Sequence, residues 1–170
     1  MQILPKRRST RLEQGHRRIA TILAAVMCLC LAHPAYAGSR SCGPEWHSAR
    51  LTNYESYPEP GSAECIENNG CTWAGQFYGG SGTYSEEWVA KHNIVAVHLK
   101  DWDWLGMKTL RLRQGTREII VQAIDACSDA DCDGCCTANL GGDGHLIDIE
   151  KYTMARFGSG DGLVEFQVCD

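Results

Sequence analysis

The sequence lacks any apolar run long enough to span a bilayer comfortably, and it has only five prolines and no N-x-S/T glycosylation acceptor. A spanning helix needs about 20 apolar residues, whereas the longest apolar run covers residues 19–32. No internal repeat or low-complexity tract is present, so a repeat architecture is not predicted. The absence of a glycosylation acceptor is compatible with a bacterial origin.

The N-terminus has the composition of an export signal. Six Lys and Arg residues precede the apolar run at 19–32, and the small-x-small sequence AYA at 35–37 offers a site for signal peptidase. We therefore predict a signal peptide over residues 1–37 and a secreted protein, either extracellular or periplasmic. The alternative is an uncleaved membrane anchor, but His33 and Pro34 interrupt the segment before it reaches spanning length.

Basic residues are scarce beyond the signal. Residues 38–170 hold ten Lys and Arg against twenty Asp and Glu, a net charge of −10. Repulsion between like charges excludes nucleic acid as a partner. A neutral polysaccharide, a cationic surface or a protein remains open as a partner. The length suits one domain with a modest core, and we predict a monomer that does not contact a membrane after signal cleavage.

Cysteine is the most informative residue type. Cys28 and Cys30 fall within the signal, and an even number remains for an oxidising compartment, so we expect four disulfides with their pairing open. Three of these cysteines lie at or before residue 71 and five at or after residue 127. Because both counts are odd, at least one bridge must join the halves. Cys135 and Cys136 are adjacent, and a bridge between neighbours is strained, so we expect them to have different partners. The eight cysteines are Cys42, Cys65, Cys71, Cys127, Cys132, Cys135, Cys136 and Cys169.

The segment IDACSDADCDGCC at 124–136 permits several kinds of site. Only Cys132-x-x-Cys135 has the spacing of a thiolate metal site, and export favours disulfides over thiolate ligands. A D-x-D-x-D-G calcium loop begins at Asp129, but Leu140 stands where a bidentate glutamate is needed. A solvated acidic loop is the alternative. We predict no bound metal and no cofactor.

The remaining chain divides into two parts. Residues 38–70 contain most of the prolines and are predicted to form an irregular, disulfide-stapled N-terminal extension. Residues 71–170 are more regular, and the T-x-x-E spacing of Thr83 and Glu86 predicts a capped helix over roughly 84–91.

Alternating and β-branched residues predict four strands in the second part, with a mixed segment between the third and the fourth. The sequence HLIDIEKYTMARFG at 145–158 begins in an extended pattern and ends as a short helix at Gly158. Several short strands with one or two small helices indicate an all-β fold built as a small barrel. The predicted strands cover residues 93–99, 108–113, 117–124 and 162–168.

Four motifs in order resemble the six-stranded double-psi β-barrel of expansins, barwin-like proteins, rare lipoprotein A and the family 45 endoglucanases. They lie between residues 71 and 169 and cover about three quarters of the chain beyond the signal. The resemblance implies a single-domain, secreted form of this barrel. The motifs are GQFYGG, LRLRQGTREIIVQAIDAC, HLIDIEKYTMARFG and GDGLVEFQV.

The resemblance also implies site residues. Asp148 matches the general acid of the barrel endoglucanases, and Asp125 matches the aspartate that lies beside it in the groove. Tyr78 resembles the groove tyrosine, although Phe77 replaces the family's threonine before it. His98 falls near the histidine that lytic transglycosylases similar to rare lipoprotein A use.

Two close carboxyl groups raise each other's proton affinity, which suits one of them to donate a proton to a glycosidic oxygen. The alternative is structural. Asp148 would then cap a helix that begins near residue 150, and Asp125 would accept hydrogen bonds from turn amides.

Aromatic side chains are available for stacking on sugar rings. Trp102 and Trp104 lie two residues apart and are expected to share one face of a turn, while Trp73 and Tyr78 lie near the groove segment. Packing over the end of the barrel is the alternative for these side chains.

Three functions remain open. The first is a secreted, expansin-like protein that binds cell-wall polysaccharide, either a cellulose-like glucan or peptidoglycan, without efficient hydrolysis. The second is a glycoside hydrolase or lytic transglycosylase in which Asp148 is the acid and Asp125 or His98 its partner. The third is a protein-binding module, such as a protease inhibitor or a virulence or defence factor.

Overall fold

The computed structural model describes residues 41–140 and 144–169. The predicted signal peptide, residues 1–37, lies outside the described residues. Within the described part of the chain, no helix is both long and apolar enough to cross a membrane.

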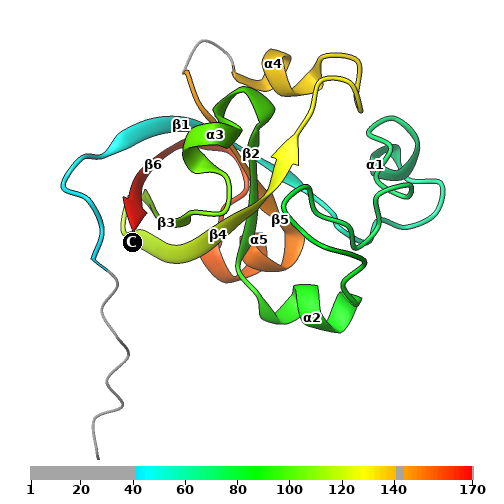
Figure 1. Cartoon of the computed structure of the whole chain (residues 1–170), viewed down its shortest axis with the longest axis horizontal. Helices are drawn as coiled ribbons and strands as arrows, with labels where there is room; N and C mark the ends of the chain where they lie inside the picture. The colour runs from blue at the N-terminus through cyan, green and yellow to red at the C-terminus, as the bar shows by residue number, and fades with distance from the viewer. Residues whose placement is uncertain (1–40, 141–143, 170) are drawn as a thin grey trace, which may run out of the picture. The chain divides into compact units, whose positions relative to one another are not determined.

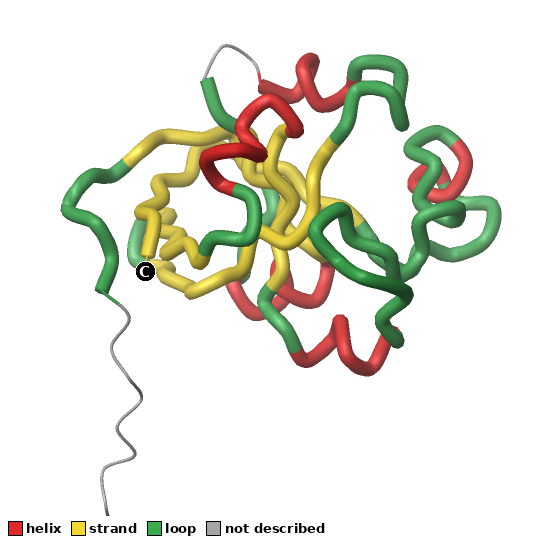
Figure 2. The backbone as a smooth tube through the Cα atoms, in the orientation of Figure 1, coloured by secondary structure: helices red, strands yellow, loops and turns green. Residues whose placement is uncertain are grey.

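Six strands close into a barrel in the order β1-β5-β2-β4-β3-β6 (Figures 1 and 2). Two neighbouring pairs, β1 with β5 and β2 with β4, are parallel, and the other four pairs are antiparallel. The prediction of an all-β fold with a six-stranded barrel and short helices is confirmed. The strands are β1 (His47–Tyr54), β2 (Ile94–His98), β3 (Thr109–Gln114), β4 (Arg117–Cys127), β5 (Leu146–Glu150) and β6 (Gly162–Cys169).

The barrel begins earlier than the sequence predicts. Its first strand, β1, lies inside the segment 38–70, which we expected to be an irregular extension before the barrel. β1 pairs with β5 on one side and with β6 on the other, so it closes the barrel. The stapled extension is therefore limited to the residues around this strand.

The barrel interior is filled by alternate residues of the strands. Ala49 and Leu51 of β1 are fully buried, as are Ile147 and Ile149 of β5. Because successive side chains of a strand point to opposite faces, the residues between them point outward. The outward residues of β1, β5 and β2 form the surface on which the candidate site is built.

A second cluster packs on the outside of the barrel. Ile94 and Ile124 lie at the start of β2 and near the end of β4, and they pack with Phe77 and Val89. Phe77 comes from the glycine-rich segment after residue 71, so this contact fixes that segment against the barrel wall. Burying such side chains stabilises the fold by about 1.5–3 kcal/mol each.

The helices are short and lie outside the barrel (Figure 1). Ser85 accepts a hydrogen bond from the Trp88 N–H and is the N-cap of α2, so the predicted capping role of Thr83 is wrong. α5 ends at Gly158, whose φ of 77° suits glycine, as predicted. The helices are α1 (Ala63–Ile66), α2 (Glu86–Lys91), the 3₁₀ helix η1 (Leu99–Asp101), α3 (Trp102–Leu105), α4 (Cys135–Leu140) and α5 (Lys151–Phe157).

Four disulfides form, as the cysteine count predicts. The Cys42–Cys169 bridge joins the segment before β1 to the end of β6, and it is the bridge between the two halves that the sequence requires. Cys135 and Cys136 have different partners, which confirms that prediction too. The other three bridges are Cys65–Cys71, Cys127–Cys136 and Cys132–Cys135.

Candidate functional site

A cleft of about 310 Å³ lies against the outer face of the barrel. Its floor contains a row of four residues that are register partners on neighbouring strands, so their side chains point to the same side. Thr52 of β1 pairs with Asp148 of β5, Asp148 pairs with Ala96 of β2, and Ala96 pairs with Asp125 of β4. The small side chain of Ala96 therefore separates two carboxyl groups.

Asp148 lies at the centre of this row and is half-buried. Thr52 Oγ1 donates a hydrogen bond of 2.7 Å to Asp148 Oδ1. Burial raises the pKa of Asp148 to about 7, the Thr52 hydrogen bond opposes that rise, and the charges of Glu64 and Asp125 add to it. At neutral pH a large fraction of Asp148 is therefore protonated and able to donate a proton.

Asp125 has a different environment. Its Oδ1 accepts 2.9 Å hydrogen bonds from the backbone N–H groups of Tyr78 and Ala126. Burial raises the pKa of Asp125, while these two N–H groups oppose the rise. The structural alternative for Asp125 is thus confirmed, since it binds backbone amides, and the same side chain also lines the cleft.

The structural alternative for Asp148 is wrong. The N-cap of α5 is Glu150, whose Oε2 accepts a 2.7 Å hydrogen bond from the Tyr152 N–H. Asp148 belongs to the strand and lies two residues before this cap. Its carboxyl group remains in the cleft.

Thr52 and Tyr54 line the cleft but were not predicted from the sequence. Both lie at the end of β1, in the segment predicted to be irregular. Thr52 supplies a hydroxyl partner for Asp148. Phe77, which stands where the resemblance predicts a threonine, has no hydroxyl group to supply. The alternation of apolar Ala49 and Leu51 with polar Ser48, Arg50 and Thr52 was the sequence signal that could have identified this strand.

Tyr54 places a hydroxyl group among the carboxyl groups of the cleft. Burial raises the pKa of Tyr54 well above its usual value, and the nearby charges of Asp125, Asp148 and Glu150 raise it further. The phenol therefore stays protonated at neutral pH. Its oxygen is buried beneath the cleft surface and is not exposed to a ligand.

The four predicted aromatic side chains separate into two groups. Trp73 and Tyr78 line the cleft and are 49% and 59% exposed, so both rings are accessible to a ligand. Trp102 and Trp104 do not line it, and they cannot share a face because their segment forms helix α3, where residues two apart point in opposite directions.

The tryptophans of α3 have packing roles. Trp102 lies under Tyr78 in an edge-on arrangement with ring centroids 4.7 Å apart, so it holds this cleft residue in place. Trp104 packs instead among His47, His145 and Phe166. The packing alternative therefore describes both tryptophans.

His98 is buried and does not line the cleft. Its Nε2 lies 3.0 Å from Thr137 Oγ1, and its Nδ1 accepts a hydrogen bond from the Lys100 N–H. These contacts join the end of β2 to α4. The histidine holds the cleft wall and has no direct access to a ligand.

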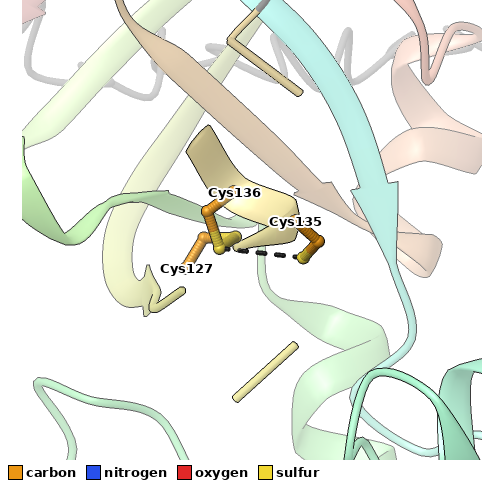
Figure 3. Close-up of side chains that lie close together, drawn as sticks. All are labelled: Cys127, Cys135 and Cys136. Carbon is orange, nitrogen blue, oxygen red and sulfur yellow. Dashed lines mark hydrogen bonds between the residues drawn. A yellow bond between two sulfur atoms is a disulfide. The ribbon is translucent and has the colours of Figure 1, made fainter. Parts of the chain in front are cut away.

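The acidic, cysteine-rich segment forms one wall of the cleft. Asp129 accepts hydrogen bonds from both the N–H and the hydroxyl of Thr137, which lower its pKa and hold the first turn of α4. The sulfur atoms of Cys127, Cys135 and Cys136 converge within 4.8 Å of one another (Figure 3). All three take part in disulfides, so they are not thiolate ligands.

The lining of the cleft is acidic. Among the described residues that line it, five carry a carboxyl group and none is Lys, Arg or His. Repulsion by this lining disfavours ligands with many negative charges. The five acids are Glu55, Glu64, Asp125, Asp131 and Asp148.

No protein-family model matches the chain. No curated protein matches it either.

Proposed function

We propose that the protein is a secreted, expansin-like protein that binds an uncharged cell-wall polysaccharide, such as a cellulose-like glucan, in the cleft. The observation that carries this proposal is the row of Thr52, Asp148, Ala96 and Asp125 on the cleft floor, with Trp73 and Tyr78 in its lining. Aromatic faces beside polar groups are the usual means of binding pyranose rings.

The charge of the cleft favours one class of polysaccharide over another. Glu55 pairs with Lys151, whose ammonium nitrogen lies 3.0 Å from its carboxylate, and Asp148 is partly protonated at neutral pH. The other three carboxyl groups of the lining therefore carry most of the charge that disfavours uronic-acid polymers and the carboxylates of peptidoglycan stem peptides. An uncharged glucan meets no such repulsion. Its hydroxyl groups can donate hydrogen bonds to the carboxyl groups of the lining.

The fold and the disulfides are compatible with this proposal. A closed six-stranded barrel with two parallel pairs agrees with a double-psi barrel, the fold that the sequence resembles. Four disulfides indicate an oxidising compartment, as expected for a protein that acts on a cell wall.

A sedimentation assay tests the binding. The purified protein is mixed with insoluble cellulose, chitin, peptidoglycan or a cross-linked polyuronate, and the bound fraction is measured. We expect retention on cellulose, and a loss of about five- to tenfold in Trp73→Ala, the cost of one stacking contact. Trp104→Ala is the matched control, because Trp104 lies outside the cleft. Equal retention of both variants, or preference for the polyuronate, would contradict the proposal.

A second function, cleavage of a glycosidic bond, is favoured by the raised pKa of Asp148, about 7. A carboxyl group that keeps its proton near neutral pH is suited to act as general acid. Asp125 lies two strands away, and strands about 4.8 Å apart give a backbone separation of roughly 10 Å. This backbone spacing is near the roughly 6.5–9.5 Å between carboxyl groups that inverting hydrolysis uses.

The test of cleavage is the release of soluble sugars from cellulose and peptidoglycan. If Asp148 is the acid, Asp148→Asn lowers release by about 10²–10⁴-fold, the usual contribution of a general acid, while retention on the polymer persists. Glu150→Gln is the control, because this neighbouring carboxyl group caps α5. Release that survives in Asp148→Asn would remove this assignment and leave binding intact.

A further inference from the structure

Two disulfides contact each other in the wall of the cleft. In one, Cys127 is bonded to Cys136, and in the other Cys132 is bonded to Cys135. The Cys136 sulfur lies 3.8 Å from the Cys132 sulfur and 3.9 Å from the Cys135 sulfur. The sulfurs of Cys127 and Cys135 also lie within 4.8 Å of each other (Figure 3). A thiolate released from one disulfide therefore lies beside the other.

We propose that these four cysteines form a thiol-catalysed disulfide-exchange site with two pairings. The second pairing joins Cys127 to Cys135 and Cys132 to Cys136, the two combinations that the sulfur distances place within reach. The third combination would join Cys135 to its neighbour Cys136, and a bridge between adjacent residues is strained. This inference is independent of the glycan-binding proposal.

The exchange needs an external thiol as catalyst and no net oxidant. The thiolate of this reagent attacks Cys135, forms a mixed disulfide there and releases the Cys132 thiolate. Cys132 then attacks Cys136, which breaks the Cys127–Cys136 bond and releases the Cys127 thiolate. Finally, Cys127 attacks Cys135 and expels the reagent as a thiolate. Two disulfides are present before and after, so electrons and atoms balance.

Access decides which disulfide reacts first. All four cysteines line the cleft. Both residues of the Cys132–Cys135 bridge are half-buried, whereas in the other bridge Cys127 is half-buried and Cys136 is fully buried. An external thiol therefore reaches the Cys132–Cys135 bond from the cleft. The buried sulfur of Cys136 is then attacked from within the protein.

The surrounding charge selects the class of thiol. Asp131 and Asp133 are exposed on either side of Cys132, and Asp129 lies at the start of the same loop. These carboxylates repel an anionic thiol such as glutathione and attract an aminothiol such as cysteamine. We expect cysteamine to catalyse the exchange roughly tenfold faster than glutathione at low salt.

The change of pairing alters the cleft wall. Cys127 ends β4, two residues after Asp125, and both pairings tie it to the first turn of α4. When the partner of Cys127 changes from Cys136 to Cys135, the point at which the disulfide is attached to α4 moves by one residue. One residue corresponds to about 100° around a helix. The α4 residues that line the cleft, Cys135, Cys136 and Asn139, are then turned relative to it.

The first experiment maps disulfides in the purified, oxidised protein. The protein is incubated with a catalytic amount of cysteamine or glutathione, quenched with acid and digested without reduction. Peptide fragmentation then distinguishes Cys135 from Cys136 as the partner of Cys127. We expect both pairings after cysteamine treatment and slower conversion with glutathione. A single pairing after prolonged cysteamine treatment would overturn the proposal, and equal rates would overturn the charge selection.

The second experiment uses Cys132→Ser, which leaves the Cys135 thiol free beside the Cys127–Cys136 bond. Attack of this thiol on Cys127 releases Cys136, so alkylation with iodoacetamide should label both Cys135 and Cys136. Label on Cys135 alone would overturn the proposal. Cys71→Ser is the matched control and leaves Cys65 free, and among the described residues no second disulfide contacts this pair. Its label should stay on Cys65.

Discussion

Two carboxyl groups on β5, those of Asp148 and Glu150, lie two residues apart on the same outer face of the barrel and have different environments. Glu150 is fully buried and accepts a hydrogen bond from the Tyr152 N–H at the start of α5. Asp148 is half-buried, faces the cleft and accepts a hydrogen bond from the side chain of Thr52. Burial raises the pKa of both groups.

The difference separates a structural acid from an acid that is available for function. When a carboxyl group caps a helix, its hydrogen bond from a backbone N–H offsets part of the free energy that burying the group costs. Asp148 satisfies no backbone donor in the described structure, yet it is kept in a position that raises its pKa to about 7. Such perturbed groups in clefts are typical of functional sites.

The largest expected effect in this comparison is the pH dependence of stability. The pKa of Asp148 rises from 3.8 to about 7 on folding. The folded state therefore favours the protonated form of Asp148. The contribution of this group to the free energy of unfolding is complete below about pH 4 and is lost as pH rises through about 7. At pH 4 we expect Asp148→Asn and wild type to have the same free energy of unfolding. At pH 8 the free energy of unfolding of Asp148→Asn should be higher than that of wild type by on the order of 3 kcal/mol. Urea denaturation at both pH values measures this, and equal stability at pH 8 would contradict it.

A second effect separates the aromatic residues of the two regions. Trp104 contacts the buried ring of Phe166, so we expect Trp104→Ala to lower the free energy of unfolding by about 2 kcal/mol. Trp73 is 49% exposed, so Trp73→Ala should cost less than about 0.5 kcal/mol. Thermal and urea denaturation of the two variants compare them directly. A larger loss for Trp73→Ala would show that Trp73 is a packing residue.

A smaller effect is expected at the helix cap. Glu150→Ala removes the acceptor of the Tyr152 N–H and should cost about 1 kcal/mol. The measurement belongs at pH 5, because at higher pH the variant also removes a charge whose burial opposes folding. Retention on cellulose should equal that of wild type. A loss of retention without a loss of stability would place Glu150 in the site.

The smallest effect concerns the partner of Asp148. Thr52→Val removes the hydroxyl donor that holds the pKa of Asp148 down, so this pKa should rise by about 0.5–1 unit. Titration of the Asp148 carboxyl carbon by NMR measures the change. An unchanged or lowered pKa would show that the hydrogen bond does not favour the charged form.

Local patterns predicted most of the strands and the helix before Gly158, because alternation and capping depend on nearby residues. They failed at β1, where prolines and cysteines on both sides hid an eight-residue strand. They also failed at Trp102 and Trp104, because a short helix reverses the directions that an extended turn would give. Tyr78 was identified as a cleft residue, but Thr52 and Tyr54 were not.

The sequence by itself determined the export signal that we predict, the need for a bridge between the halves and the periodicity of most strands, because these follow from composition and from neighbours along the chain. Only the tertiary structure decided that Thr52, Asp148, Ala96 and Asp125 form one row, and which cysteines lie in contact. Register between strands far apart in sequence depends on how the whole barrel closes, and no local pattern encodes it.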